Sequence, residues 1–111
     1  MLYKFKSKNS GDIIMLQANG QQLLEIIGKA EHGSVADKGI ILPEQMPGAI
    51  KALEAAVLQE EADRAAAVAD ALAKHEPVPH FAAIALRQRA QPFIQMLQRC
   101  QQDGDDVVWG V

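Results

Sequence analysis

The residue types best suited to hold a ligand stand together in Arg87-Gln88-Arg89. A guanidinium group grips a carboxylate or a phosphate through two parallel hydrogen bonds. When this segment is placed on a helix at 100° per residue, Arg89 falls inside the apolar arc and Arg87 lies at its margin or beyond. Because an unpaired buried charge is costly, Arg89 should reach outward along its stem or meet a carboxylate. Arg89 and Arg87 are therefore the candidate ligand-binding residues.

A structural salt bridge explains Arg89 better than a ligand does. No second cationic or glycine-rich element marks an anion pocket, whereas folds routinely tie a helix to a sheet edge through an ion pair. The carboxylates expected on neighbouring elements are Asp12, Glu25 and Glu44. We predict a structural role for Arg89, and the alternative is a small-molecule or anion site lined by Arg89 and Arg87.

The histidines and the single cysteine do not form a convincing site. A metal site could be suggested by His75 and His80 with Glu76 between them, and His32 could add a further ligand. These ligands would straddle two prolines, and they lack the i, i+4 register of helical zinc sites. Cys100 projects into the middle of an apolar stripe, where a thiol is usually inert. We therefore predict no catalytic residue, no metal and no cofactor, and an enzyme is disfavoured.

Length and composition limit the class of protein. The chain has 111 residues, 49% of them hydrophobic, which suits a single domain over residues 1–111 with one core. A lone cysteine and an N-terminus without an apolar signal segment favour the cytoplasm. No apolar stretch approaches the roughly 20 residues of a membrane span. A net charge of -3 argues against nucleic acid as a partner.

Strands are predicted at both ends of the chain. Tyr3 and Phe5 alternate with lysines in the first strand, over residues 2–5, and residues 12–16 should pair with it as a hairpin. Residues 107–111, which contain the only tryptophan, should form a third strand. This last strand should pair with the first and close the fold. The lysine row at positions 4, 6 and 8 is interpreted as protection of a sheet edge rather than as a binding stripe.

Three helices are predicted between these strands. Asn19 and Gln22 resemble a capping box that opens a short first helix, which Gly28 ends. Residues 29–38 should form a loop, and residues 39–42 lead extended into a proline.

The third helix is expected over about residues 81–102. It should carry a kink or a restart at Pro92 and end at Gly104, with glutamines opposite its apolar face.

The second helix, over residues 47–74, changes character halfway. Large apolar residues line it up to position 58, whereas alanine and charge dominate the rest. A continuous helix of this length would measure about 40 Å, so its outer part must be covered or must project. We interpret residues 59–80 as a variable alanine-rich arm with a proline-containing linker. The arm should self-associate around Ala66, Ala67 and Ala71.

These elements predict an α+β fold in which three helices cover one face of a small, mainly antiparallel sheet of three strands, two N-terminal and one C-terminal. The order of several segments resembles the domain of unknown function family 1840, a group of small bacterial proteins. The segments that carry the resemblance are MLYKFKSK at 1–8, GDIIML at 11–16, LEIIGK at 24–29, KGII at 38–41, MPGAI at 46–50, LRQRAQPF at 86–93 and VVWGV at 107–111.

The resemblance implies a stand-alone bacterial cytoplasmic protein and brings no established activity and no site residues. From the residues themselves we expect a non-enzymatic interaction or accessory protein that self-associates as a homo-oligomer, such as a dimer, or binds another protein. The alternative is a small-molecule or anion-binding protein, conceivably an enzyme, with an arginine-lined pocket.

Overall fold

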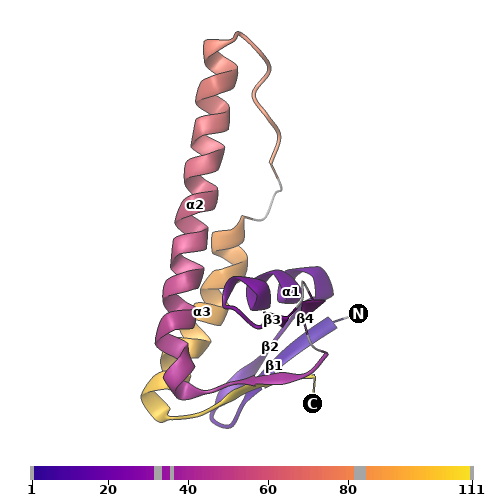
Figure 1. Ribbon diagram of the computed structural model, residues 1–111, viewed down its shortest axis with the longest axis vertical. Coiled ribbons are helices and arrows are strands. Elements are labelled where there is room, and N and C mark those ends of the chain that lie inside the picture. The colour runs from indigo at the N-terminus through magenta and orange to yellow at the C-terminus, as the bar shows by residue number, and fades with distance from the viewer. Residues whose placement is uncertain (1, 32–33, 36, 82–84, 111) are drawn as a thin grey trace.

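The computed structural model describes residues 2–31, 34–35, 37–81 and 85–110, which form short strands and helices (Figure 1). In chain order they are β1 (Leu2–Ser7), β2 (Ser10–Leu16), α1 (Gln17–Ile26), β3 (Ala30–Glu31), β4 (Ser34–Val35), β5 (Gly39–Ile41), a 3-10 turn (Pro43–Gln45), α2 (Met46–Ala73), α3 (Leu86–Asp103) and β6 (Val107–Trp109).

The main sheet is antiparallel, in the order β2-β1-β6-β5. Phe5 lies opposite Trp109, so the predicted pairing of the two ends of the chain is confirmed, as is the α+β class. The prediction of three strands is wrong, because β5 pairs with the outer side of β6 as a fourth. With three residues and one glycine, β5 has too short a pattern to be recognised alone.

Gly39 shows why β5 fits so closely on β6. Gly39 is paired with Trp109, and a Cβ atom at this position would fall on the indole ring. The missing side chain leaves room for the ring, which packs 6.3 Å from the Phe5 ring, centroid to centroid. The fourth strand therefore depends on a glycine that in the sequence alone resembles loop composition.

The lysine row does not protect a sheet edge. β1 lies inside the sheet between β2 and β6, and the edge strands are β2 and β5. β2 contains no lysine. Lys4 is exposed and alternates with the buried Tyr3 and Phe5, so the row lies on the sheet face that the helices leave uncovered.

α1 begins three residues earlier than a cap at Asn19 would allow. It follows β2 directly, its N-cap is Leu16, and no side chain caps it, so the predicted capping box is wrong. The predicted end at Gly28 is confirmed, because this glycine adopts φ +86° and accommodates the reversal of the chain. The loop predicted over residues 29–38 contains the short β3–β4 pair.

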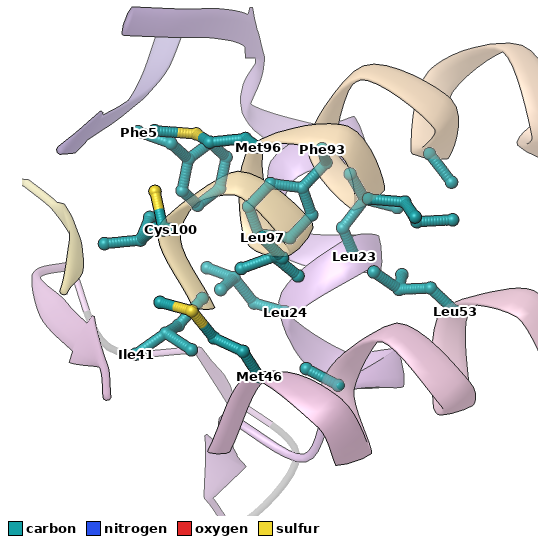
Figure 2. Packing of buried hydrophobic residues seen from close by; sticks show 14 of the residues in the cluster. Phe5, Leu23, Leu24, Ile41, Met46, Leu53, Phe93, Met96, Leu97 and Cys100 are labelled. Atoms are coloured by element: carbon teal, nitrogen blue, oxygen red, sulfur yellow. The ribbon is translucent and has the colours of Figure 1, made fainter. Parts of the chain in front are cut away.

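One cluster of buried side chains joins the sheet to all three helices (Figure 2). α1 contributes Leu23 and Leu24, α2 contributes Met46 and Leu53, and Phe5 contacts the Phe93 ring at 4.7 Å between centroids. The members on α3 confirm the predicted apolar face. They are Leu86, Ala90, Phe93, Ile94, Met96, Leu97 and Cys100.

α3 starts at Leu86, later than the predicted position 81, and residues 82–84 lie outside the described residues. The helix runs through Pro92 without a restart and ends at Gly104, which takes the predicted left-handed conformation with φ +71°.

α2 is longer than the body of the molecule is wide. Its 28 residues correspond to about 42 Å of helix, and the molecule measures 52 × 28 × 26 Å. Figure 1 shows the second half of α2 rising past the start of α3, accompanied only by the chain that returns from its end. Among the described residues, no helix is both long enough and apolar enough to cross a membrane.

Candidate functional site

Arg87 forms a two-pronged ion pair with α2. Its Nε donates to Glu61 Oε1 at 2.6 Å, and its Nη2 donates to Glu61 Oε2 at 3.1 Å. Both side chains are about half exposed. The hydrogen bond from Arg87, helped by its charge, lowers the pKa of Glu61 below the usual value of a glutamate, and the same contact raises the pKa of Arg87. The pair ties the start of α3 to the middle of α2.

A second polar cluster fixes the same junction. Glu60 accepts a hydrogen bond from the backbone N–H of Leu86, the first residue of α3, at 3.3 Å. Glu60 also pairs with Arg64 at 2.6 Å, and the Arg64 guanidinium lies over the Phe81 ring, 4.9 Å from its centroid. These contacts hold the returning chain against α2. Sequence reasoning missed them because they depend on the register between two helices whose connection cannot be read locally.

Arg89 points the other way, toward α1. Its Nη1 donates to Asn19 Oδ1 at 2.9 Å, and the side chain is partly buried as its helical position predicts. Its partner among the described residues is thus an amide oxygen, not one of the predicted carboxylates. Arg89 Nε is buried and has no hydrogen-bond partner among these residues. A buried donor without a partner is uncommon in folded proteins.

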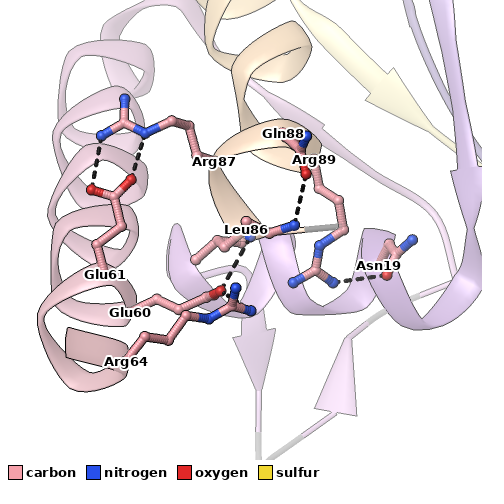
Figure 3. A network of polar contacts seen from close by, with 9 residues as sticks. Asn19, Glu60, Glu61, Arg64, Leu86, Arg87, Gln88 and Arg89 are labelled. Carbon is pink, nitrogen blue, oxygen red and sulfur yellow. Dashed lines mark hydrogen bonds and ion pairs between the residues drawn. The ribbon is translucent and has the colours of Figure 1, made fainter. Parts of the chain in front are cut away.

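The two candidate arginines do not meet. Figure 3 shows Arg87 reaching to Glu61 on α2 while Arg89 extends to Asn19 on α1. Two residues apart on one helix, they diverge by about 160°. A shallow groove of about 230 Å³ between α2 and α3 is lined by Arg87 and not by Arg89. The structure therefore does not build one pocket lined by both guanidinium groups.

The remaining sequence candidates form no metal-binding cluster among the described residues. His75 follows α2 with φ +57° and is exposed, as are Glu76 and His80. Within the described ranges, no three His, Cys, Asp or Glu side chains gather closely enough to hold a metal, and His32 is outside those ranges. The Cys100 thiol is buried in the core and donates to Ser7 Oγ at 3.2 Å, so the predicted packing role is confirmed.

The outward surface of α2 is the most unusual surface of the arm. Leu58, Ala62, Ala65, Ala69 and Leu72 are all exposed and succeed one another at alternating steps of four and three residues. Leu58 is 62% exposed and Leu72 is 61% exposed. Steps of four and three are the spacing of a coiled-coil seam. We call these five residues the outer stripe.

The outer stripe is not the surface that the sequence suggested. Ala71 is 5% exposed, and Ala67 is partly covered. Both turn toward the side on which the chain returns from α2, where Phe81 packs over Arg64. Ala71 is therefore not free to meet a second copy, whereas the predicted association around Ala66 and Ala67 stays a prediction. Ala66 is exposed but lies off the outer stripe.

The elements together define a small α+β protein with a projecting helical arm. The family model described as Domain of unknown function (DUF1840) matches residues 1–109, and the chain belongs to this family. No curated protein and no solved structure matches the chain.

Proposed function

We propose that the protein is a non-enzymatic interaction protein that self-associates through the outer stripe of α2. The observation that carries the proposal is the exposure of two leucines and three alanines in coiled-coil spacing on a helix that projects from its own core. Alanine lets two helix backbones approach closely, and the leucines at the two ends supply apolar area.

An antiparallel pair of arms fits this stripe. With Ala62 facing Ala65 of a second copy, the seam repeats symmetrically: its central layers pair two alanines, and its outer layers combine a large residue with a small one. The layers join Ala55 to Leu72, Leu58 to Ala69, and Ala62 to Ala65. The antiparallel direction also sets the positive end of each helix dipole against the negative end of the other.

Charged residues at the ends of this pair are complementary. In the same register Glu54 lies beside Lys74 of the second copy, the C-cap residue of α2. Both side chains are exposed in the single chain. Each end of the pair therefore brings opposite charges together, which favours this direction and register over a parallel pair.

Light scattering at high micromolar concentration tests the proposal. The wild-type chain should have twice the 12.0 kDa mass of one copy, and Ala65→Glu should reduce it to one copy by placing an unpaired charge in the seam. Ala66→Glu is the matched control, because Ala66 is exposed but lies roughly 80° around the helix from the stripe. A single-copy mass for the wild type, or equal effects of the two variants, would contradict the proposal.

One observation favours a second candidate function, the binding of a small anion at Arg89. The buried Nε of Arg89 lacks a partner among the described residues and is able to donate to an oxyanion. Phosphate and sulfate should then raise the melting temperature of the wild type more than that of Arg89→Gln. Equal shifts in both proteins would remove this candidate.

A further inference from the structure

The sheet face opposite the helices carries large apolar side chains that stay exposed in the part of the chain that the structure describes. Leu2 is 60% exposed, Ile14 is 55% exposed, Leu16 is 62% exposed and Ile40 is 40% exposed. The face of an antiparallel sheet that meets water is normally polar. Apolar side chains concentrated there are typical of a surface that binds a partner.

The strand register brings three of these residues into one cluster. Leu2 lies directly opposite Leu16, and Ile14 stands on the same face of β2, two residues from Leu16. Side chains paired in this way are about 5 Å apart, and residues two apart on a strand are separated by about 7 Å. Leu2, Ile14 and Leu16, which we call the apolar corner, therefore form a continuous patch over β1 and β2.

Two lysines border the apolar corner. Lys4 is paired with Ile14, and Lys6 is paired with Val108 across β1 and β6. Among the described residues, neither lysine takes part in an ion pair or a side-chain hydrogen bond. Both line a hollow of about 390 Å³ where β6 ends beside β1, with Asp37 on its wall. The ammonium groups are thus free to meet carboxylates that come from outside.

We propose that this face docks an acidic amphipathic helix of another protein. The apolar stripe of the helix would pack on Leu2, Ile14 and Leu16, and carboxylates on its flank would reach Lys4 and Lys6. Residues at i and i+4 of a helix are 5–6 Å apart, close to the spacing within the apolar corner. A helix about 10 Å wide covers two strands 4.8 Å apart.

Two other occupants fit the charges less well. A second copy stacked face to face would bring the Lys4 and Lys6 rows of both copies into the same interface. A membrane surface is disfavoured because Lys4 and Lys6 fall short of the roughly four to eight basic side chains that usually mark a surface for anionic lipid. The surface is also separate from the outer stripe of α2, so the inference does not depend on self-association.

Two synthetic helical peptides of about 18 residues, or five turns, provide the probe. Both have the same leucine stripe, and its flanks carry glutamates in one peptide and lysines in the other. Fluorescence anisotropy at low salt should show the wild-type protein binding the glutamate peptide at least about tenfold more tightly than its lysine twin. The preference should reverse in Lys4→Glu/Lys6→Glu, whereas Lys51→Glu on α2 should keep it.

Ile14→Ser/Leu16→Ser should abolish binding of the glutamate peptide and leave the melting temperature unchanged, because both side chains are already exposed. Failure of the wild type to bind either peptide, or equal binding of both, would overturn the proposal. So would stronger binding to phosphatidylcholine–phosphatidylserine vesicles than to the glutamate peptide. If Ile14→Ser/Leu16→Ser had a smaller mass in solution than the wild type, the face would be an interface between two copies. This result would also overturn the proposal.

Discussion

The two halves of α2 have similar helix-forming composition but different surroundings. The inner half buries Met46, Leu53 and Val57 in the core, whereas the outer half buries only Ala71, under the chain's own linker. The comparison shows that helix propensity and burial are separable: alanine and charge continue the helix where the core has ended. Stability should therefore depend on the inner half and the sheet, and association should depend on the outer half.

The largest expected effect is the loss of stability on removal of β6, which tests whether the sheet rather than the arm stabilises the fold. Truncation after Asp106 removes β6, which joins β1 to β5, and with it the burial of Trp109. That burial is worth on the order of 3 kcal/mol, a large share of the stability of a small domain, and two strands lose their partner as well. The truncated chain should be unfolded by circular dichroism. Native ellipticity with an unchanged melting temperature would show that the sheet is not the stabilising region.

A smaller loss should follow from filling the space at Gly39. Gly39→Val would place side-chain atoms on the Trp109 ring and should destabilise by about 1–3 kcal/mol through overpacking. Gly48→Ala, on the exposed side of α2, meets nothing within 4 Å and should stabilise by up to about 1 kcal/mol. Urea unfolding of both variants measures the difference. If Gly39→Val were as stable as the wild type, β5 would not pack on β6 as described.

The contact between Arg89 and Asn19 should contribute less. Asn19→Ala removes the acceptor of a partly buried guanidinium and should cost about 1 kcal/mol in the free energy of unfolding. Asn9→Ala is the matched control, because Asn9 donates to Asp105 on the exposed surface and its loss should cost less than about 0.5 kcal/mol. Equal losses of unfolding free energy in the two variants would show that the hydrogen bond between Arg89 and Asn19 contributes no more than an exposed one.

The smallest expected effect concerns the ion pair between Arg87 and Glu61, which lies near the junction of the two halves of α2 and is about half exposed. Arg87 lowers the pKa of Glu61, so the pair stabilises the fold at pH values above the usual glutamate pKa of 4.5, and this contribution is lost as the pH falls through the lowered pKa. In Arg87→Gln, carboxyl NMR titration should find the pKa of Glu61 nearer 4.5. Arg99→Gln should not move it. An unchanged Glu61 pKa in Arg87→Gln would show that the pair does not form in solution.

Features with a strong local pattern could be predicted from the sequence. The alternation in β1 and the 3.6-residue period of α3 identified the strand and the buried face, and the helical angle of Arg89 predicted its partial burial. The partner of Arg89 could not be predicted, because Asn19 lies 70 residues earlier and its approach depends on how α1 packs. β5 was missed because only its pairing with β6 makes three residues a strand.

The burial of Ala71 could not be predicted for a related reason. The alanines at positions 66, 67 and 71 are the same residue type as those of the outer stripe, so composition does not distinguish them. The return path of residues 74–81 runs along α2, and Ala71 is buried whereas Leu58 and Leu72 are exposed. That path is a long-range feature, since two prolines end the helical pattern without fixing the direction that follows.

Sedimentation equilibrium of the wild type and of Leu58→Glu/Leu72→Glu tests the division between a stabilising core and an associating arm most directly. The account predicts a wild type of about 24 kDa, twice the 12.0 kDa of one chain, and a double variant of one-chain mass with the same melting temperature at low protein concentration. Both side chains are more than half exposed, so their replacement removes no core packing. A one-chain mass for the wild type up to high micromolar concentration, or a two-chain mass for the double variant, would contradict the account.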